Sequence, residues 1–171
     1  MNDWRVEMKN VHSISEVKKI LEHVVDPEIP VLTIADLGIL RNIEFKNDEW
    51  IITITPTYSG CPAMKMIEDE IGLTLKKKGI ENVKVVSVLS PAWTTDWLSE
   101  EGKKKLEEYG IAPPVHASAD KKVLLGGTGE VRCPRCKSKN TVMKSLFGST
   151  ACKALYVCND CKEPFDYFKC L

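Results

Sequence analysis

The chain has 171 residues, a formal net charge of zero, 43% hydrophobic and 28% charged residues, and seven cysteines. This composition supports a packed core and argues against disorder, and the length fits one ordinary domain with a small second one. No apolar run approaches the roughly 20 residues of a membrane helix, and the N-terminus lacks the basic and then apolar pattern of a secretory signal. Cysteines in such a chain favour reduced thiols, metal ligands or catalysis over a disulfide framework.

Charge and composition divide the chain into three parts. Residues 131–171 hold eight Lys and Arg against three Asp and Glu, whereas residues 1–130 hold sixteen against twenty-one. Residues 112–130 contain two adjacent prolines and three clustered glycines, which break regular structure. We therefore predict an α/β domain over residues 1–111, a linker over 112–130 and a separate domain over 131–171.

The first helix and a β-hairpin are expected early in the first domain. Ser13 or Ser15 can cap a helix that ends before Pro27. Residues 40–45 and 50–56 alternate apolar and polar around a polar turn at 46–49, which predicts two antiparallel strands. The apolar face expected for the helix is Ile14, Val17, Ile20, Leu21, Val24 and Val25.

Two more helices and a third strand complete this domain. Pro62 suits the first turn of a helix that Gly79 stops, residues 83–89 are β-branched and apolar, and a helix is expected over about 99–109. The order α-β-β-α-β-α predicts an α+β protein with a small layered domain of helices on a sheet. The side chains available for burial in the second helix are Met64, Ile67, Ile71, Leu73 and Leu75.

Two CxxC pairs form the strongest motif of the chain. Cys133 and Cys136 are separated by twenty-one residues from Cys158 and Cys161. Each pair lets two thiolates converge on one ion, and together they complete a tetrahedral S₄ shell that suits zinc, although a rubredoxin-like iron site has the same ligands. Strands at 141–145, 154–157 and 165–168 would make this β-rich part a zinc ribbon. Because protein fills all four positions and 41 residues bury little apolar surface, the metal is expected to be structural.

Two features of the ribbon leave alternatives open. Cys152 and Cys170 are either small buried residues or ligands of a second, transient cluster. The segment between the knuckles is either a tight structural turn or a partner-docking surface. The candidate docking residues are Phe147, Gly148, Ser149, Thr150 and Lys153.

Cys61 is the candidate working thiol of the first domain. It lies in Thr57–Pro62, where a strand gives way to a helix, and the backbone N–H groups of a helix N-terminus favour thiolate. None of the three histidines stands in a recognisable motif with it, which disfavours a cysteine nucleophile. Upstream, Asp26 and Glu28 are either a cap and turn or hard oxygen ligands near the thiol.

These segments together resemble a known family. Asp26–Pro30 and Ile34–Gly38, followed by Thr57–Pro62, are similar to the iron–sulfur assembly domain family typified by SufT and the eukaryotic cytosolic iron–sulfur targeting proteins. The run Ser90–Trp97 and the cysteine tail look like the PaaD family, which is encoded with phenylacetyl-CoA 1,2-epoxidase. The resemblance covers nearly the whole chain except the linker.

The resemblance implies a cytoplasmic accessory protein rather than a catalyst. Such a protein helps to assemble or maintain metal centres of the epoxidase system, and its expected partners are the oxygenase and reductase subunits and other iron–sulfur assembly proteins. The family's cluster-handling cysteine corresponds to Cys61, and the loop with Asp26 and Glu28 is expected close to it. The implied cofactors are zinc and a transient iron–sulfur cluster or iron.

Two other functions remain open at this point. A structural subunit or adaptor would hold the epoxidase components together without handling metal. A nucleic-acid module would use the basic ribbon, whose formal charge falls to about +3 once four thiolates bind Zn²⁺. An oxygenase subunit is disfavoured because the paired Glu-x-x-His helices of a di-iron site are absent from the sequence.

Overall fold

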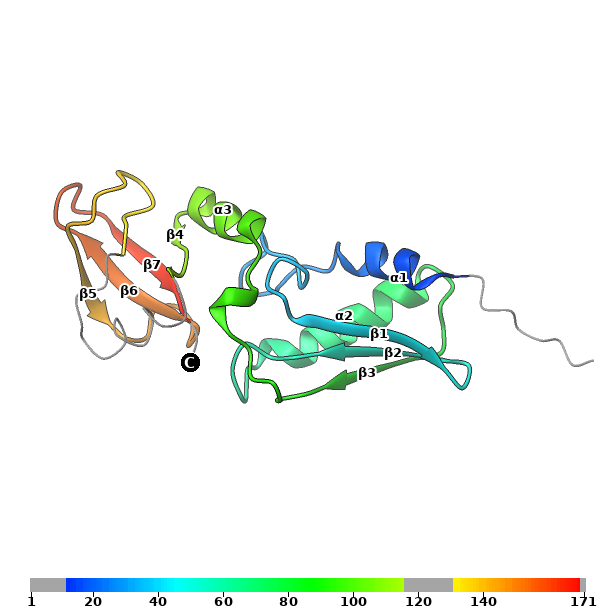
Figure 1. Cartoon of the computed structure of the whole chain (residues 1–171). Coiled ribbons are helices and arrows are strands. Elements are labelled where there is room, and N and C mark those ends of the chain that lie inside the picture. The colour runs from blue at the N-terminus through cyan, green and yellow to red at the C-terminus, as the bar shows by residue number, and fades with distance from the viewer. Residues whose placement is uncertain (1–11, 116–130, 170–171) are drawn as a thin grey trace, which may run out of the picture.

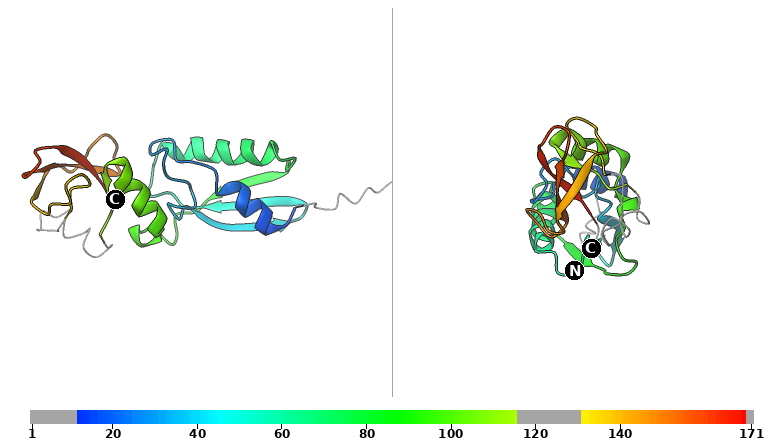
Figure 2. Two further views of the ribbon diagram at one scale, coloured as in Figure 1. Left: turned by 90° about the horizontal axis from the view of Figure 1, so that it is seen from above. Right: turned by 90° about the vertical axis from the view of Figure 1, so that its left-hand side faces the viewer.

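The computed structural model describes residues 12–115 and 131–169. The chain forms two sheets that lie end to end along the long axis of the molecule (Figure 1, Figure 2). The predicted α+β class and the order α-β-β-α-β-α of the first part are confirmed, whereas most of the predicted linker lies outside the described residues. In chain order the elements are α1 (Ile14–Leu21), β1 (Leu40–Lys46), β2 (Glu49–Ile54), α2 (Ala63–Lys76), β3 (Val83–Ser87), the 3₁₀ turn η1 (Thr95–Trp97), α3 (Glu100–Tyr109), β4 (Ile111–Ala112), β5 (Thr141–Ser145), β6 (Lys153–Cys158) and β7 (Pro164–Phe168).

The first sheet has the order β1-β2-β3. Strands β1 and β2 are antiparallel, and Asn47 and Asp48 between them both have positive φ, 53° and 59°, as a two-residue type I′ hairpin turn requires. Strand β3 runs parallel to β2 because α2 carries the chain back along the sheet. The loop that follows β2 therefore opens at the end of the sheet where α2 begins (Figure 1).

Helices α1 and α2 pack against each other and against this sheet. Alternate residues of β2, namely Trp50, Ile52 and Ile54, point into the core they cover. Ser13 caps α1 through a capping box with Glu16. The predicted helical faces are wrong at three residues that the structure leaves exposed: Ile14 (54%), Val25 (45%) and Leu73 (52%).

The second sheet has the order β4-β7-β6-β5. Strands β5, β6 and β7 form an antiparallel ribbon whose aromatic core is Tyr156, Phe165 and Tyr167. The three ribbon strands predicted from the sequence are found within one residue of their expected bounds.

The two parts of the chain share both a sheet and a core. Strand β4, which directly follows α3, pairs in parallel with β7, so that Ala112 lies opposite Tyr167. Phe168 and Cys152 of the ribbon belong to the apolar core of the first domain, where Trp93 meets Phe168 edge to face at 6.1 Å. The ribbon is therefore packed onto the first domain, on the side of η1 and α3 (Figure 1).

Candidate functional site

The four cysteines of the two CxxC motifs meet at one end of the ribbon. Their Sγ atoms all lie within 4.8 Å of one another, with 3.7 Å between Cys133 and Cys161 and 3.5 Å between Cys136 and Cys158. Four thiolates at about 2.3 Å from a tetrahedral ion would be about 3.8 Å apart. The donor set and its spacing fit a tetrahedral thiophilic metal, as predicted for these four residues.

Both pairs of cysteines lie on knuckles with the same backbone geometry. The N–H of Lys137 donates to the carbonyl of Cys133, and that of Lys162 donates to the carbonyl of Cys158. Lys137 and Lys162 also have left-handed φ values of 62° and 66°, which turn the chain back after each CxxC. The sequence therefore builds two matching ligand turns.

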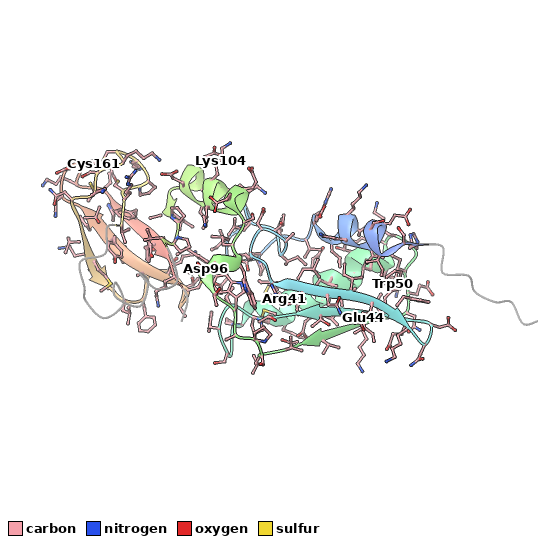
Figure 3. All side chains as sticks on the ribbon, viewed as in Figure 1. Arg41, Glu44, Trp50, Asp96, Lys104 and Cys161 are labelled. Carbon is pink, nitrogen blue, oxygen red and sulfur yellow. The ribbon has the colours of Figure 1, made fainter. Side chains whose placement is uncertain are left out.

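The knuckle backbone also favours the thiolate form of one ligand. The backbone N–H groups of Cys161 and Asp160 lower the pKa of the Cys158 thiol to about 7. Cys133 and Cys158 are buried, while Cys136 lies on the surface. Cys161 lies at one end of the molecule, and Trp50 of the first sheet lies toward the other end (Figure 3).

Cys61 lies in the loop between β2 and α2, immediately before Pro62, the N-cap residue of the helix. Its N–H donates to the carbonyl of Tyr58, and Gly60 adopts a φ of 84° to make this turn. The side chain is half-buried, and the nearby Tyr58 hydroxyl acts to lower the pKa of its thiol. The thiol thus lies at the helix N-terminus predicted from the sequence, near a phenol that belongs to none of the predicted site residues.

The Asp26–Glu28 turn lies within electrostatic range of this thiol. Asp26 Oδ1 accepts hydrogen bonds from the N–H groups of Glu28 and Ile29, both at 2.8 Å, so Asp26 acts as the turn-former. Asp26 is buried, and burial raises the pKa of its carboxyl. The carboxylates of both Glu28 and Asp26 are near enough to Cys61 to raise the pKa of its thiol. The three candidate cluster-handling residues therefore lie within electrostatic range of one another.

The electrostatics at Cys61 differ from the expectation drawn from the helix N-terminus. The backbone N–H of Ala63 and the hydroxyl of Tyr58 do favour thiolate, but burial and the two carboxylates outweigh them. The pKa of Cys61 is raised above its ordinary value as a result, so the thiol keeps its proton. A positive ion bound between these groups would instead lower the pKa of the thiol and favour the thiolate.

The segment that includes the candidate docking residues forms a tight loop. The Gly148 N–H donates to the Lys153 carbonyl at 2.7 Å, and a Cβ on Gly148 would lie 2.6 Å from Asp166 Oδ1. Ser149 Oγ donates to Asp166, and Lys153 is only 6% exposed. Phe147, at 57% exposure, is the large apolar side chain that this segment presents to solvent.

Both parts of the chain match families of known proteins. Residues 14–89 match the family model described as iron–sulfur cluster assembly protein, and residues 117–169 match the PaaD zinc beta ribbon domain. The crystal structure of a domain of unknown function, DUF59, from Bacillus anthracis superposes with a TM-score of 0.50 at 28% identity, covering 54% of this chain and 89% of that one.

Two curated relatives span the same regions. The putative D subunit of 1,2-phenylacetyl-CoA epoxidase from Escherichia coli K12 is 49% identical over 92% of this chain and 93% of its own length. The Fe-S protein maturation auxiliary factor YitW of Bacillus subtilis is 36% identical over 48% of this chain and 82% of its own length.

The fold, the two family matches and the ribbon cysteines define an iron–sulfur assembly-type protein that carries a zinc ribbon with a Cys₄ metal-binding group. The chain belongs to the PaaD family, to which the putative D subunit of the Escherichia coli epoxidase also belongs. Within residues 12–115 and 131–169, no helix is long and apolar enough to cross a membrane.

Proposed function

We propose that this protein is an accessory factor that binds iron or a labile iron–sulfur cluster at Cys61 and supplies it to metal-containing subunits of a phenylacetyl-CoA epoxidase system. It belongs with those subunits and with other iron–sulfur assembly proteins in the cytoplasm. The proposal rests on one observation. Asp26 and Glu28 lie within electrostatic range of Cys61, although they precede it by 35 and 33 residues.

Negative groups held close to a thiol make an arrangement that favours a cation. Each carboxylate disfavours ionisation of Cys61, so the three groups together gain most when a positive ion lies among them. Iron accepts both thiolate and carboxylate ligands, and iron–sulfur clusters are held mainly by thiolates. A raised thiol pKa is the opposite of what an activated cysteine nucleophile needs, which supports cargo binding over catalysis.

The ribbon metal serves a different purpose in this proposal. Zinc fills the Cys₄ group and supplies folding free energy to a sheet that is too small to be stable by burial alone. Because cysteine sulfur occupies all four positions, the site leaves none for a reacting ligand.

The basic side chains of the ribbon argue against the nucleic-acid alternative, because several of them are paired or buried. Arg135 pairs with Glu163 at 3.2 Å and Lys137 with Glu107 of α3 at 2.6 Å. Lys153 and Lys169 are buried. Half of the ribbon's eight basic side chains are therefore engaged within the fold rather than free for phosphates.

Replacing the thiol tests the proposed function. In Cys61→Ser we expect zinc content and the circular dichroism spectrum to be unchanged, because the side chain is half-buried and keeps its volume. Anaerobic reconstitution with Fe²⁺ and sulfide should then leave little iron on the protein, and an apo reductase subunit should no longer recover its cluster. Ser59→Ala, an exposed change in the same loop, is the matched control.

Iron binding and reductase recovery at wild-type level in Cys61→Ser would contradict the proposal. A stable complex with the epoxidase subunits in that same variant would then favour the adaptor function.

A further inference from the structure

The ribbon brings a second cysteine to the surroundings of Cys61. Cys152 Sγ lies 3.6 Å from Glu28 Oε2, although the two residues are 124 positions apart. Glu28 also acts electrostatically on Cys61, and, after burial, the proximity of Cys61, Glu28 and Cys152 raises the pKa of Tyr58. Cys152 therefore contacts Glu28 directly, and both thiols lie within electrostatic range of Glu28 and Tyr58.

Cys152 is held firmly in this position. Its sulfur is hydrogen-bonded to Thr150 Oγ1 at 3.0 Å, and its carbonyl accepts from the N–H of Lys169 at 2.9 Å. It is 5% exposed and packs in the core of the first domain. The tight loop before it is closed by the hydrogen bond from the Gly148 N–H to the Lys153 carbonyl and leads directly into β6, which begins one residue after Cys152.

The polar contacts of Cys152 distinguish it from a cysteine that only fills volume. A structural cysteine usually packs among apolar groups, whereas this sulfur lies between a hydroxyl and a carboxylate. Glu28 and Lys153 both act electrostatically on it, and Lys169, whose N–H donates to its carbonyl, is a second buried lysine at this end of the ribbon. The Glu28 carboxylate is the acidic group in contact with this sulfur, and it would attract a bound cation.

We propose that Cys152 is the second thiolate ligand of the cargo, so that an iron ion or small iron–sulfur cluster at Cys61 is held across the junction of the two domains with Glu28 between the sulfurs. This inference rests on the proposed function of Cys61. Each thiol releases its proton when it coordinates the metal, as thiolate ligation requires. Two protein sulfurs leave coordination positions for the cysteines of a client, which a transfer site needs.

The test uses the full-length, zinc-loaded protein and Co²⁺ as a probe, under anaerobic conditions. The intensity of the thiolate-to-Co²⁺ charge-transfer absorption rises with the number of sulfur ligands. We expect Cys152→Ser and Cys61→Ser each to reduce it by about half and the double variant to abolish it. Asp166→Ala, which removes a hydrogen bond of the same loop but keeps both sulfurs, should retain the wild-type intensity. Zinc content is measured in every variant.

The outcomes separate this inference from the function on which it rests. Wild-type intensity in Cys152→Ser with a loss in Cys61→Ser would overturn the role of Cys152 and leave Cys61 as the site. Wild-type intensity in Cys61→Ser would overturn the proposed function itself. If Cys152→Ser does not fold, X-ray absorption at the iron edge of the Fe²⁺-loaded wild-type protein decides: two sulfur ligands support the inference and one overturns it.

Discussion

At the scale of single residues, Gly38 joins two segments that are distant in sequence. Its φ is 66°, and a Cβ there would lie 2.5 Å from the carbonyl oxygen of Trp97. Beside it, the Trp93 indole N–H donates to the Leu37 carbonyl at 2.7 Å, and Arg41 lies 3.6 Å from the centre of the Trp97 ring. The Asp-Leu-Gly and Trp-containing motifs are thus one packing unit, on which the ribbon rests through Phe168.

Gly38→Ala should therefore destabilise the first domain strongly. The added methyl group meets backbone that cannot rotate away, which adds about 1–3 kcal/mol of overpacking to about 1–2 kcal/mol of left-handed strain. Gly79→Ala is the matched control, because its φ is 80° and a Cβ there would meet nothing within 4 Å. Urea unfolding followed by tryptophan fluorescence measures both, and equal losses in the two variants would refute the close contact.

At this scale, the sequence could predict local motifs but not contacts between residues that are far apart in the chain. The knuckle cysteines could be assigned because their spacing alone builds the ligand turns. Tyr58 lies three positions before Cys61 and could have been found from that spacing. The contact between Glu28 and Cys152 could not, because no local pattern reports on a pair that the packing of two domains brings together.

At the scale of elements, Asp36 fastens the loop after α1 to helix α3. Its carboxylate accepts from the N–H and hydroxyl of Thr33, each at 3.0 Å, from Ser99 Oγ at 3.3 Å and from Lys105 Nζ at 2.7 Å. Ser99 is the N-cap of α3, so this one carboxylate holds the start of the helix in place. Burial alone would raise the pKa of Asp36, but Lys105 and Thr33 outweigh it and lower the pKa below the ordinary 3.8.

Asp36→Asn should lower the free energy of unfolding by about 1–3 kcal/mol at neutral pH, since it weakens several buried hydrogen bonds at once. A carboxyl whose folded pKa is lowered stabilises the fold above its unfolded pKa, and this stabilisation disappears as the pH falls through the folded pKa. The difference between variant and wild type should therefore shrink below about pH 4. Thermal unfolding at a series of pH values measures it.

Asp69→Asn is the control for that experiment. Asp69 pairs with Lys65 on the exposed side of α2, where an ion pair contributes about 0.3–0.5 kcal/mol. A loss as large as that of Asp36→Asn, or one that does not change with pH, would contradict the buried anchor.

The elements themselves were largely predictable. Capping at Ser13 and Ser99, the left-handed hairpin turn and the β-branched strands are local signals, and the structure places elements at each of them. The prediction that Leu73 is buried is wrong. Helix α2 buries the stripe that contains Ile67, Ile71 and Leu75, and Leu73 lies outside this stripe. The pairing of β4 with β7 was not foreseen, because a two-residue strand carries no periodicity.

At the scale of the whole molecule, one strand connects the two cysteine sites. Cys158 ends β6 at the metal knuckles, and Cys152 directly precedes its first residue. Six residues of extended chain span about 20 Å. The metal group and the proposed cargo ligand therefore lie at opposite ends of a single rigid element.

Removing the ribbon metal should unfold residues 131–169 and leave the first domain folded. Without the ion, four thiols remain around a core of a few aromatic side chains, while α1, α2 and the first sheet keep their own core. Amide NMR spectra before and after chelation should lose dispersion in the ribbon alone, and Cys133→Ser should give the same spectrum without chelator. Unchanged ribbon signals would show that the metal is not structural.

The parallel pairing of β4 with β7 also determines how the ribbon can be studied in isolation. In the intact chain, Ile111 and Ala112 cover the outer backbone of β7 near Asp166 and Tyr167. A fragment that starts after this strand would present those backbone groups, together with the apolar Phe168, as an open sheet edge that recruits strands from other copies. Self-association of such a fragment would reflect where it was cut and not an assembly property of the native protein.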